Sequence, residues 1–82
     1  MTPTILDLTG LKCPLPALLT RKALARLAPG AWLEVRCTDP MAVIDIPAML
    51  QQHGDRLDSC RRAGESIVFT IEKHDGAISN PD

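Results

Sequence analysis

Aromatic residues are scarce in this sequence: its 82 residues include one Trp, one Phe and no Tyr. Proteins that bind single-stranded nucleic acid stack successive bases on several aromatic side chains, and this chain lacks them. The same scarcity requires a core built from aliphatic side chains. Hydrophobic residues make up 45% of the chain, which is typical of a globular protein and argues against wholesale disorder.

A surplus of positive charge is also absent. Nine basic residues stand against ten acidic residues, which gives a formal net charge of −1. Proteins that bind nucleic acid on their own generally carry a basic surplus or a basic patch. We therefore expect no direct nucleic-acid partner, although the adjacent Arg61 and Arg62 leave room for a local basic patch.

Long apolar runs and an even set of cysteines are missing too. No run approaches the roughly 18–20 apolar residues that span a bilayer. Residues 1–4 contain no basic residue of the kind that begins a secretory signal. The three cysteines are an odd number and do not form a disulfide framework. We expect a cytoplasmic protein with reduced thiols and no membrane association.

The length of the chain allows one small domain. A chain of this size buries only about 60% of the surface that it exposes when unfolded, so its core is modest. Apolar periodicity runs from residue 5 to about residue 73 and is absent beyond. We predict a single, monomeric domain over residues 1–73 with a loose terminus at residues 1–4, followed by a disordered tail over residues 74–82.

The apolar pattern alternates between the periods of strands and helices. It predicts strands over 5–8, 32–37, 56–62 and 66–72, and helices over 14–28 and 40–53, with a hairpin turn at 63–65. This order predicts an α+β fold, a two-layer sandwich in which two helices pack on one face of a four-stranded mixed sheet. The strand residues predicted to face the core are Leu33, Val35, Cys37, Ile67, Phe69 and Ile71, with Trp32 on the other face or at its margin.

Prolines and glycines mark the ends of both helices. The Pro29-Gly30 pair ends the first helix, and Gly54 ends the second. Pro47 falls inside the second helix, where it removes a hydrogen bond and clashes with the preceding turn. We expect a kink there, or a short segment followed by a new start capped by Asp45. The buried stripe predicted for the first helix is Leu15, Leu19, Ala23 and Leu27, with Leu18 and Leu24 at its edges.

Cys13 stands between the first strand and the first helix. This places it at about the N-cap position, with Pro14 at the first helical position, where a proline is well tolerated. Pro16 also lies in the first turn and stiffens it. The start of a helix favours negative charge, and Lys12 is adjacent, so we predict a lowered pKa for the Cys13 thiol.

This segment resembles the signature of the TusA/SirA-type sulfur carriers, in the form Leu8-x-Gly10-Leu11-x-Cys13-Pro14-x-Pro16. The resemblance covers about residues 5–73. Further matches are Arg21-Lys22, Pro29-Gly30, Thr38-Asp39-Pro40 and Asp45-Ile46-Pro47.

The resemblance implies a specific role for Cys13. In such a carrier the cysteine accepts sulfane sulfur as a persulfide from a cysteine desulfurase or a rhodanese-like protein and passes it to an acceptor protein. The sulfur then serves tRNA thiolation, cofactor synthesis or sulfur oxidation. The resemblance also implies supporting roles for Gly10, Lys12, Pro14 and Pro16, partner docking at Arg21 and Lys22, and no cofactor beyond the transient persulfide.

Other chemistry-bearing residues have ordinary structural explanations. Cys37 and Cys60 fall within strands and are predicted to be packing residues. Asp39 and Asp45 each precede a helical proline and are predicted to be caps; paired carboxylates for acid–base chemistry are set aside. His53 and His74 fall at a helix end and in the tail. The cysteines and histidines show no spacing typical of zinc.

Three other functions remain open at the level of the sequence. The first is a regulatory or adaptor domain that binds partners without sulfur transfer. The second is a nucleic-acid-binding module, which charge and aromatic content oppose. The third is an independent sulfurtransferase that turns over thiosulfate without any partner protein. The carrier hypothesis differs from the third because it requires partner enzymes for turnover.

Overall fold

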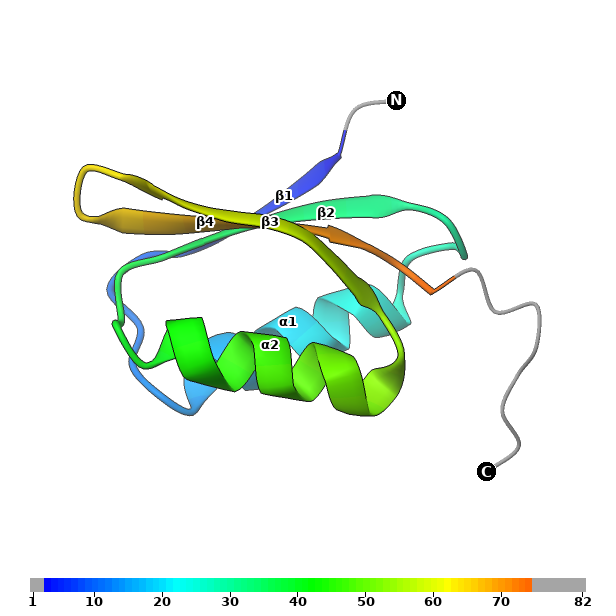
Figure 1. Cartoon of the computed structure of the whole chain (residues 1–82), viewed down its shortest axis with the longest axis horizontal. Helices are drawn as coiled ribbons and strands as arrows, with labels where there is room; N and C mark the ends of the chain where they lie inside the picture. Colours follow the sequence, from blue (N-terminus) through cyan, green and yellow to red (C-terminus); the bar gives the residue numbers. More distant parts are fainter. Residues whose placement is uncertain (1–2, 75–82) are drawn as a thin grey trace.

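A computed structural model describes residues 3–74 as two layers, a sheet and a pair of helices that cover one of its faces (Figure 1). The elements in chain order are β1 (Thr4–Leu8), α1 (Leu15–Ala25), β2 (Trp32–Cys37), α2 (Ala42–His53), β3 (Arg56–Ala63) and β4 (Ser66–Glu72). The predicted fold class and element order are therefore confirmed. Neither helix of the described residues is long and apolar enough to cross a membrane.

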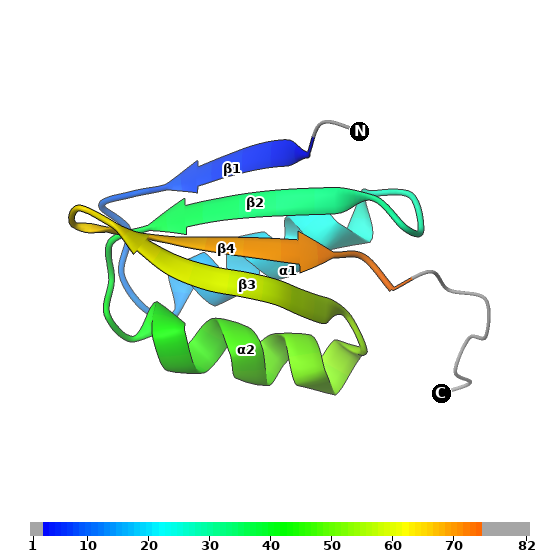
Figure 2. The same ribbon diagram turned by 45° about the horizontal axis from the view of Figure 1, so that its top comes forward.

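The four strands lie in the order β1-β2-β4-β3, as Figure 2 shows. β1 and β2 are parallel neighbours joined through α1, whereas β4 runs antiparallel to both β2 and β3. Because parallel strands end at the same edge of a sheet, the segments that follow β1 and β2 meet there. The register pairs Leu8 with Cys37, the last residues of the two strands. This edge positions Cys13.

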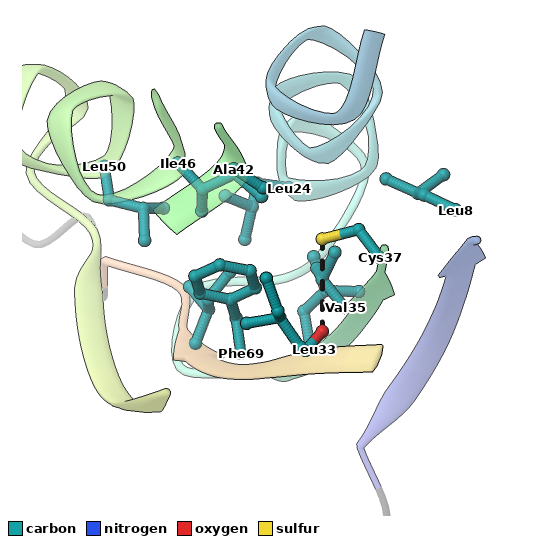
Figure 3. Packing of buried hydrophobic residues seen from close by; sticks show 11 residues of the cluster. Leu8, Leu24, Leu33, Val35, Cys37, Ala42, Ile46, Leu50 and Phe69 are labelled. Atoms are coloured by element: carbon teal, nitrogen blue, oxygen red, sulfur yellow. Dashed lines mark hydrogen bonds between the residues drawn. The ribbon is translucent and has the colours of Figure 1, made fainter. Parts of the chain in front are cut away.

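The core lies between the sheet and the helices (Figure 3). Its largest side chain, Phe69 on β4, is fully buried, as are Leu33 and Val35 on β2. Each such side chain contributes about 1.5–3 kcal/mol through burial. The strand residues predicted to face the core all do so, and β4 also buries Val68 on the opposite face. The other members of the core are Leu8, Leu24, Cys37, Ala42, Ile46, Leu50, Ile67 and Ile71.

The predicted stripe of α1 is confirmed in part. Leu19, Ala23 and Leu27 are half-buried and pack against the core. The fully buried side chains of α1 are Pro16, Thr20 and Leu24, whereas Leu15 and Leu18 are exposed. The pattern of apolar residues overlooked Thr20, whose hydroxyl donates to the backbone carbonyl of Pro16 at 2.7 Å and so needs no water. A threonine that satisfies its hydroxyl within its own helix can occupy a core position.

The element boundaries differ from the predictions at several ends. β1 begins at Thr4, although the sequence predicts a loose terminus over residues 1–4. α1 ends at Ala25 and not at residue 28 as predicted. The hydrogen bonds of Arg26 and Leu27 already reach back only three residues. The predicted tail lies outside the described residues except for His74, whose backbone N–H donates to Asp55 at 2.7 Å.

α2 runs as one helix through Pro47, so the predicted restart at Asp45 is wrong. It begins at Ala42, two residues later than predicted, and ends at Gly54, whose φ of 81° requires glycine. Proline leaves the carbonyl four residues earlier without a helical donor. That residue is Val43, which is exposed, so water can satisfy its carbonyl.

Candidate functional site

Cys13 lies in the loop between β1 and α1, exposed to solvent. Gly10 has a φ of 86°, a conformation that side-chain-bearing residues rarely adopt, and this turn brings the chain back from the edge of the sheet. The N–H of Gly10 donates to the Thr38 hydroxyl at 2.9 Å. Thr38 follows β2, so this bond ties the two loops at the sheet edge together.

Asp39 makes the second tie between these loops. One oxygen of its carboxylate accepts the backbone N–H of Cys13, and the other accepts the N–H of Met41 at 3.1 Å. Asp39 therefore supports the turn before α2, but its predicted role as the cap of that helix is wrong, because the N-cap is Met41 and the helix has no side-chain cap bond. The same side chain holds the backbone of Cys13 in place.

Asp45 makes the third tie, and it reaches the sulfur itself. The Cys13 thiol donates to Oδ2 of Asp45 across 2.8 Å. Asp45 lies inside the first turn of α2, so its predicted role as a cap is wrong. Both carboxylates, which the sequence predicts to be caps without acid–base chemistry, accept hydrogen bonds from Cys13. The sequence signal for this is topological: both follow β2, the parallel neighbour of the strand that precedes Cys13.

The pKa of the Cys13 thiol lies above its ordinary value, contrary to the predicted lowering. The main cause is the hydrogen bond to Asp45, which stabilises the thiol; partial shielding from water and the charges of Asp45 and Asp39 act in the same direction. These three effects make the thiolate harder to form. The predicted contribution of the helix start is outweighed by carboxylates that come from distant parts of the sequence.

The start of α1 also offers the sulfur fewer N–H donors than an ordinary helix. Pro14 is the N-cap and makes no side-chain cap bond, so Cys13 stands one position before the predicted one. Prolines at positions 14 and 16 have no N–H to donate. The N–H of Cys13 is taken by Asp39, and that of Leu15 by the carbonyl of Lys12 at 2.9 Å. Few N–H groups at the start of α1 are therefore available to stabilise a negative charge on the sulfur.

Exposed apolar side chains surround this loop. Apart from Ile5, the exposed large hydrophobic residues of the described chain all belong to the start of α1 or the start of α2. Exposed apolar surface gathered in one place is typical of a protein interface. We refer to these residues as the apolar rim: Leu15, Leu18, Met41, Val43 and Ile44.

The remaining predicted site residues lie around or away from the thiol. Lys12 is exposed beside Cys13. Arg21 and Lys22, predicted to dock partners, are exposed about two turns further along α1. They border different depressions: Arg21 lines one with His53 and Lys73, and Lys22 lines one with Leu6 and Leu19. The structure does not bring either residue to the Cys13 thiol.

The two other cysteines have opposite environments. Cys37 is fully buried in the core, as predicted. Cys60 is exposed on β3, so its predicted packing role is wrong. Although Cys60 faces Phe69 across the β3–β4 pair, β3 is an edge strand and leaves it uncovered. No group of three or more potential ligands among residues 3–74 is arranged to hold a metal ion.

Comparisons with known proteins agree on one family. The family model described as "Sulfurtransferase TusA" matches residues 4–73. A sulfur carrier protein TusA of Allochromatium vinosum is 40% identical over 68 residues, which cover 83% of this chain and 90% of that protein. A putative sulfur carrier protein of Neisseria meningitidis serogroup A is 44% identical over 72 residues, or 87% of this chain and 93% of the relative.

A solved structure shares the fold. The crystal structure of a SirA-like protein from Desulfitobacterium hafniense matches with a TM-score of 0.76, covering 87% of this chain and 97% of that one. Its sequence identity is 24%, so this likeness concerns the arrangement of helices and strands.

Proposed function

Because the chain belongs to the TusA family of sulfurtransferases, we propose that it is a sulfur carrier whose cargo is bound to Cys13. One observation carries the assignment of the residue: Cys13 is an exposed thiol, held by three hydrogen-bond ties where the loops after β1 and β2 meet. A fixed, accessible sulfur surrounded by apolar surface suits transfer between proteins.

The proposed cycle has two steps of thiol exchange. Cys13 attacks the outer sulfur of a donor persulfide, and the donor cysteine leaves as a thiolate, so that Cys13 becomes a persulfide. A cysteine of an acceptor protein then attacks the outer sulfur and releases the Cys13 thiol. Each step breaks one sulfur–sulfur bond and forms another, so no external oxidant or cofactor is required.

The proposed partners are a cysteine desulfurase or a rhodanese-like protein as donor and a sulfur-accepting protein downstream. The sulfur would go on to tRNA thiolation, cofactor synthesis or sulfur oxidation. We propose that the protein acts as a monomer in the reducing cytoplasm, since the cycle requires free thiols. Arg21 and Lys22 are proposed to contact partners outside the apolar rim, and Gly10, Lys12, Pro14 and Pro16 to shape the Cys13 loop.

Mass spectrometry of the intact protein tests this function. The protein is incubated with a cysteine desulfurase, pyridoxal phosphate and cysteine, and then with a reductant. We expect a mass gain of one sulfur that the reductant reverses. Cys13→Ser should abolish the gain. Cys60→Ser is the matched control because Cys60 is also an exposed thiol, and it should load sulfur like the wild type.

An interaction module without sulfur transfer is the second candidate, and the apolar rim favours it independently of Cys13. The two candidates make opposite predictions for Cys13→Ser. If the protein is a carrier, the variant keeps its partners and stops downstream sulfur incorporation. If it is only an adaptor, sulfur incorporation continues unchanged.

A further inference from the structure

The Cys13 thiol donates a hydrogen bond to the carboxylate of Asp45. This contact is not required to keep the sulfur accessible, so it calls for another explanation. We propose that Asp45 keeps Cys13 protonated until a sulfur-exchanging protein brings a cationic side chain to Asp45 and Asp39. This inference rests on the proposed function, because it describes how the carrier's thiol becomes able to take up sulfur from a donor. It assigns Asp45 as a positioning residue and identifies a basic group as a required feature of the partner.

Charged side chains near the thiol come from the loops after β1 and β2 and from α2. Asp45 accepts a hydrogen bond from the thiol at 2.8 Å, and Asp39 accepts one from the backbone N–H of the same residue. Lys12 precedes Cys13 and is exposed. Among residues 3–74, no lysine or arginine forms an ion pair with Asp39 or Asp45; the ion pairs of Arg36 and Arg56 are with other carboxylates. Both carboxylates are half-buried rather than enclosed, so a cation from outside can reach them.

The chemistry of the thiol explains why such a cation matters. The nucleophile in sulfur exchange is the thiolate, and a neighbouring carboxylate opposes its formation. When a cation pairs with Asp45, the thiol proton is released to water. The Cys13 thiolate then attacks the outer sulfur of the donor persulfide. A bond between these sulfurs forms while the donor's own sulfur–sulfur bond breaks, and the donor cysteine leaves with the electron pair.

The protonated state also protects an exposed sulfur. Oxidation of cysteine follows its thiolate character and its accessibility, and Cys13 is accessible. Suppressing the thiolate reduces reaction with small oxidants while leaving the thiol available to a partner that neutralises the acidic pair. The occupant of this surface is thus a protein with an apolar contact area for the rim and a lysine or arginine beside its reactive cysteine.

Disulfides of different charge test this inference without any sulfur donor. The protein reacts with cystamine, which is cationic, or with bis(2-hydroxyethyl) disulfide, which is neutral, and modification of Cys13 and Cys60 is followed in separate peptides. We expect Cys13 to prefer cystamine several-fold in the wild type. Cys60 is followed by Arg61 and Arg62, so the same molecule contains a thiol that should lack this preference.

The variant Asp45→Asn should show a weaker preference for cystamine at Cys13 and react several-fold faster with neutral iodoacetamide near neutral pH, because the carboxylate that contacts the thiol is gone while Asp39 remains. Asp58→Asn is the matched control: it removes an exposed carboxylate that pairs with Arg56 on β3, and both rates should stay as in the wild type. In the wild type alone, added salt should weaken the preference of Cys13 for cystamine.

Two outcomes would overturn the proposal. One is an equal preference for cystamine at Cys13 and Cys60 of the wild type. The other is slower reaction of Asp45→Asn with iodoacetamide, which would show that Asp45 activates the thiol. Sulfur loading by the desulfurase is measured separately. If the protein loads sulfur but Cys13 shows no preference for cystamine, only the proposed role of Asp45 is refuted. If Cys13 prefers cystamine but the protein does not load sulfur, the carrier function is refuted.

Discussion

The loop around Cys13 and the core around Cys37 lie near the same edge of the sheet, yet the two environments raise the pKa of a thiol for different reasons. Both thiols have a pKa above the ordinary value. For Cys37 the pKa rises from 9.0 to about 11, mainly through burial, with Asp39 and Cys60 adding to it. For Cys13 the leading cause is the hydrogen bond to Asp45 on an exposed surface.

The difference is whether another molecule can reverse the effect. Burial of Cys37 is part of the packing of β2 against β4 and the helices, so only unfolding removes it. The carboxylate beside Cys13 is half-buried next to an exposed thiol, where a cation or a change of charge can cancel its effect. A raised pKa therefore indicates an inert thiol in one region and a controllable thiol in the other.

Alkylation of the native protein should show the largest difference between the two thiols. Cys37 must wait for the core to open, which for a free energy of opening of about 5 kcal/mol slows its reaction by roughly a thousandfold or more. Cys13 needs no opening. Pulse labelling with iodoacetamide, read by peptide mass spectrometry, should modify Cys13 and leave Cys37 intact until denaturant is added. Comparable rates would mean that Cys37 is not enclosed.

Stability at high pH should reveal the buried thiol. The folded pKa of Cys37 is raised, so its contribution is fully present below pH 9.0 and is lost as the pH rises through about 11. The loss amounts to about 2–3 kcal/mol in the free energy of unfolding. Urea unfolding between these pH values should show it, and Cys37→Ala should flatten the slope. An unchanged slope in the variant would assign the loss to other groups.

Replacement of Cys37 and of Cys60 by serine compares a buried cysteine with an exposed one. Cys37→Ser places a hydroxyl in the core and should lower the free energy of unfolding by about 1–3 kcal/mol. Cys60→Ser should change it by less than about 0.5 kcal/mol, because Cys60 is exposed. Chemical denaturation of both variants measures the two values, and equal losses would contradict the assigned environments.

Asp39 is the residue that connects the two regions, since its charge raises the pKa of both thiols. Asp39→Asn should lower both pKa values and, by weakening the turn before α2, cost about 1 kcal/mol of stability. Thiolate absorbance is measured during pH titration of two variants that both contain Cys60→Ser. One also contains Cys13→Ser and the other Cys37→Ala, so each keeps a single thiol. Comparison with and without Asp39→Asn then gives the shift of each thiol separately. A shift confined to one thiol would disprove the shared influence.

The sequence was sufficient for the order of the elements because their periods differ clearly. β2 alternates apolar and polar residues, and the buried set of Leu33, Val35 and Cys37 is the predicted one. The end of α2 at Gly54 was also predictable, since a glycine after a helix provides the left-handed conformation. These features depend on residues that are neighbours in the sequence.

The features that were missed depend on side-chain hydrogen bonds and on the position of a strand in the sheet. Asp45 reaches the Cys13 thiol across 32 positions, and local reasoning about the helix start predicted the opposite pKa shift. Thr20 is buried because its own helix accepts its hydrogen bond. Cys60 is exposed because its strand lies at the edge of the sheet. None of these facts is visible in an apolar pattern.

The position of β3 at the edge of the sheet has a consequence for the crowded cell. An unpaired strand edge is a template on which another chain can add a strand, and charged side chains discourage this. β3 is exposed over nearly its whole length and displays four charged residues: Arg56, Asp58, Arg61 and Arg62. Self-association through this edge is therefore opposed, which leaves the apolar rim as the surface available for contact with the proposed partners.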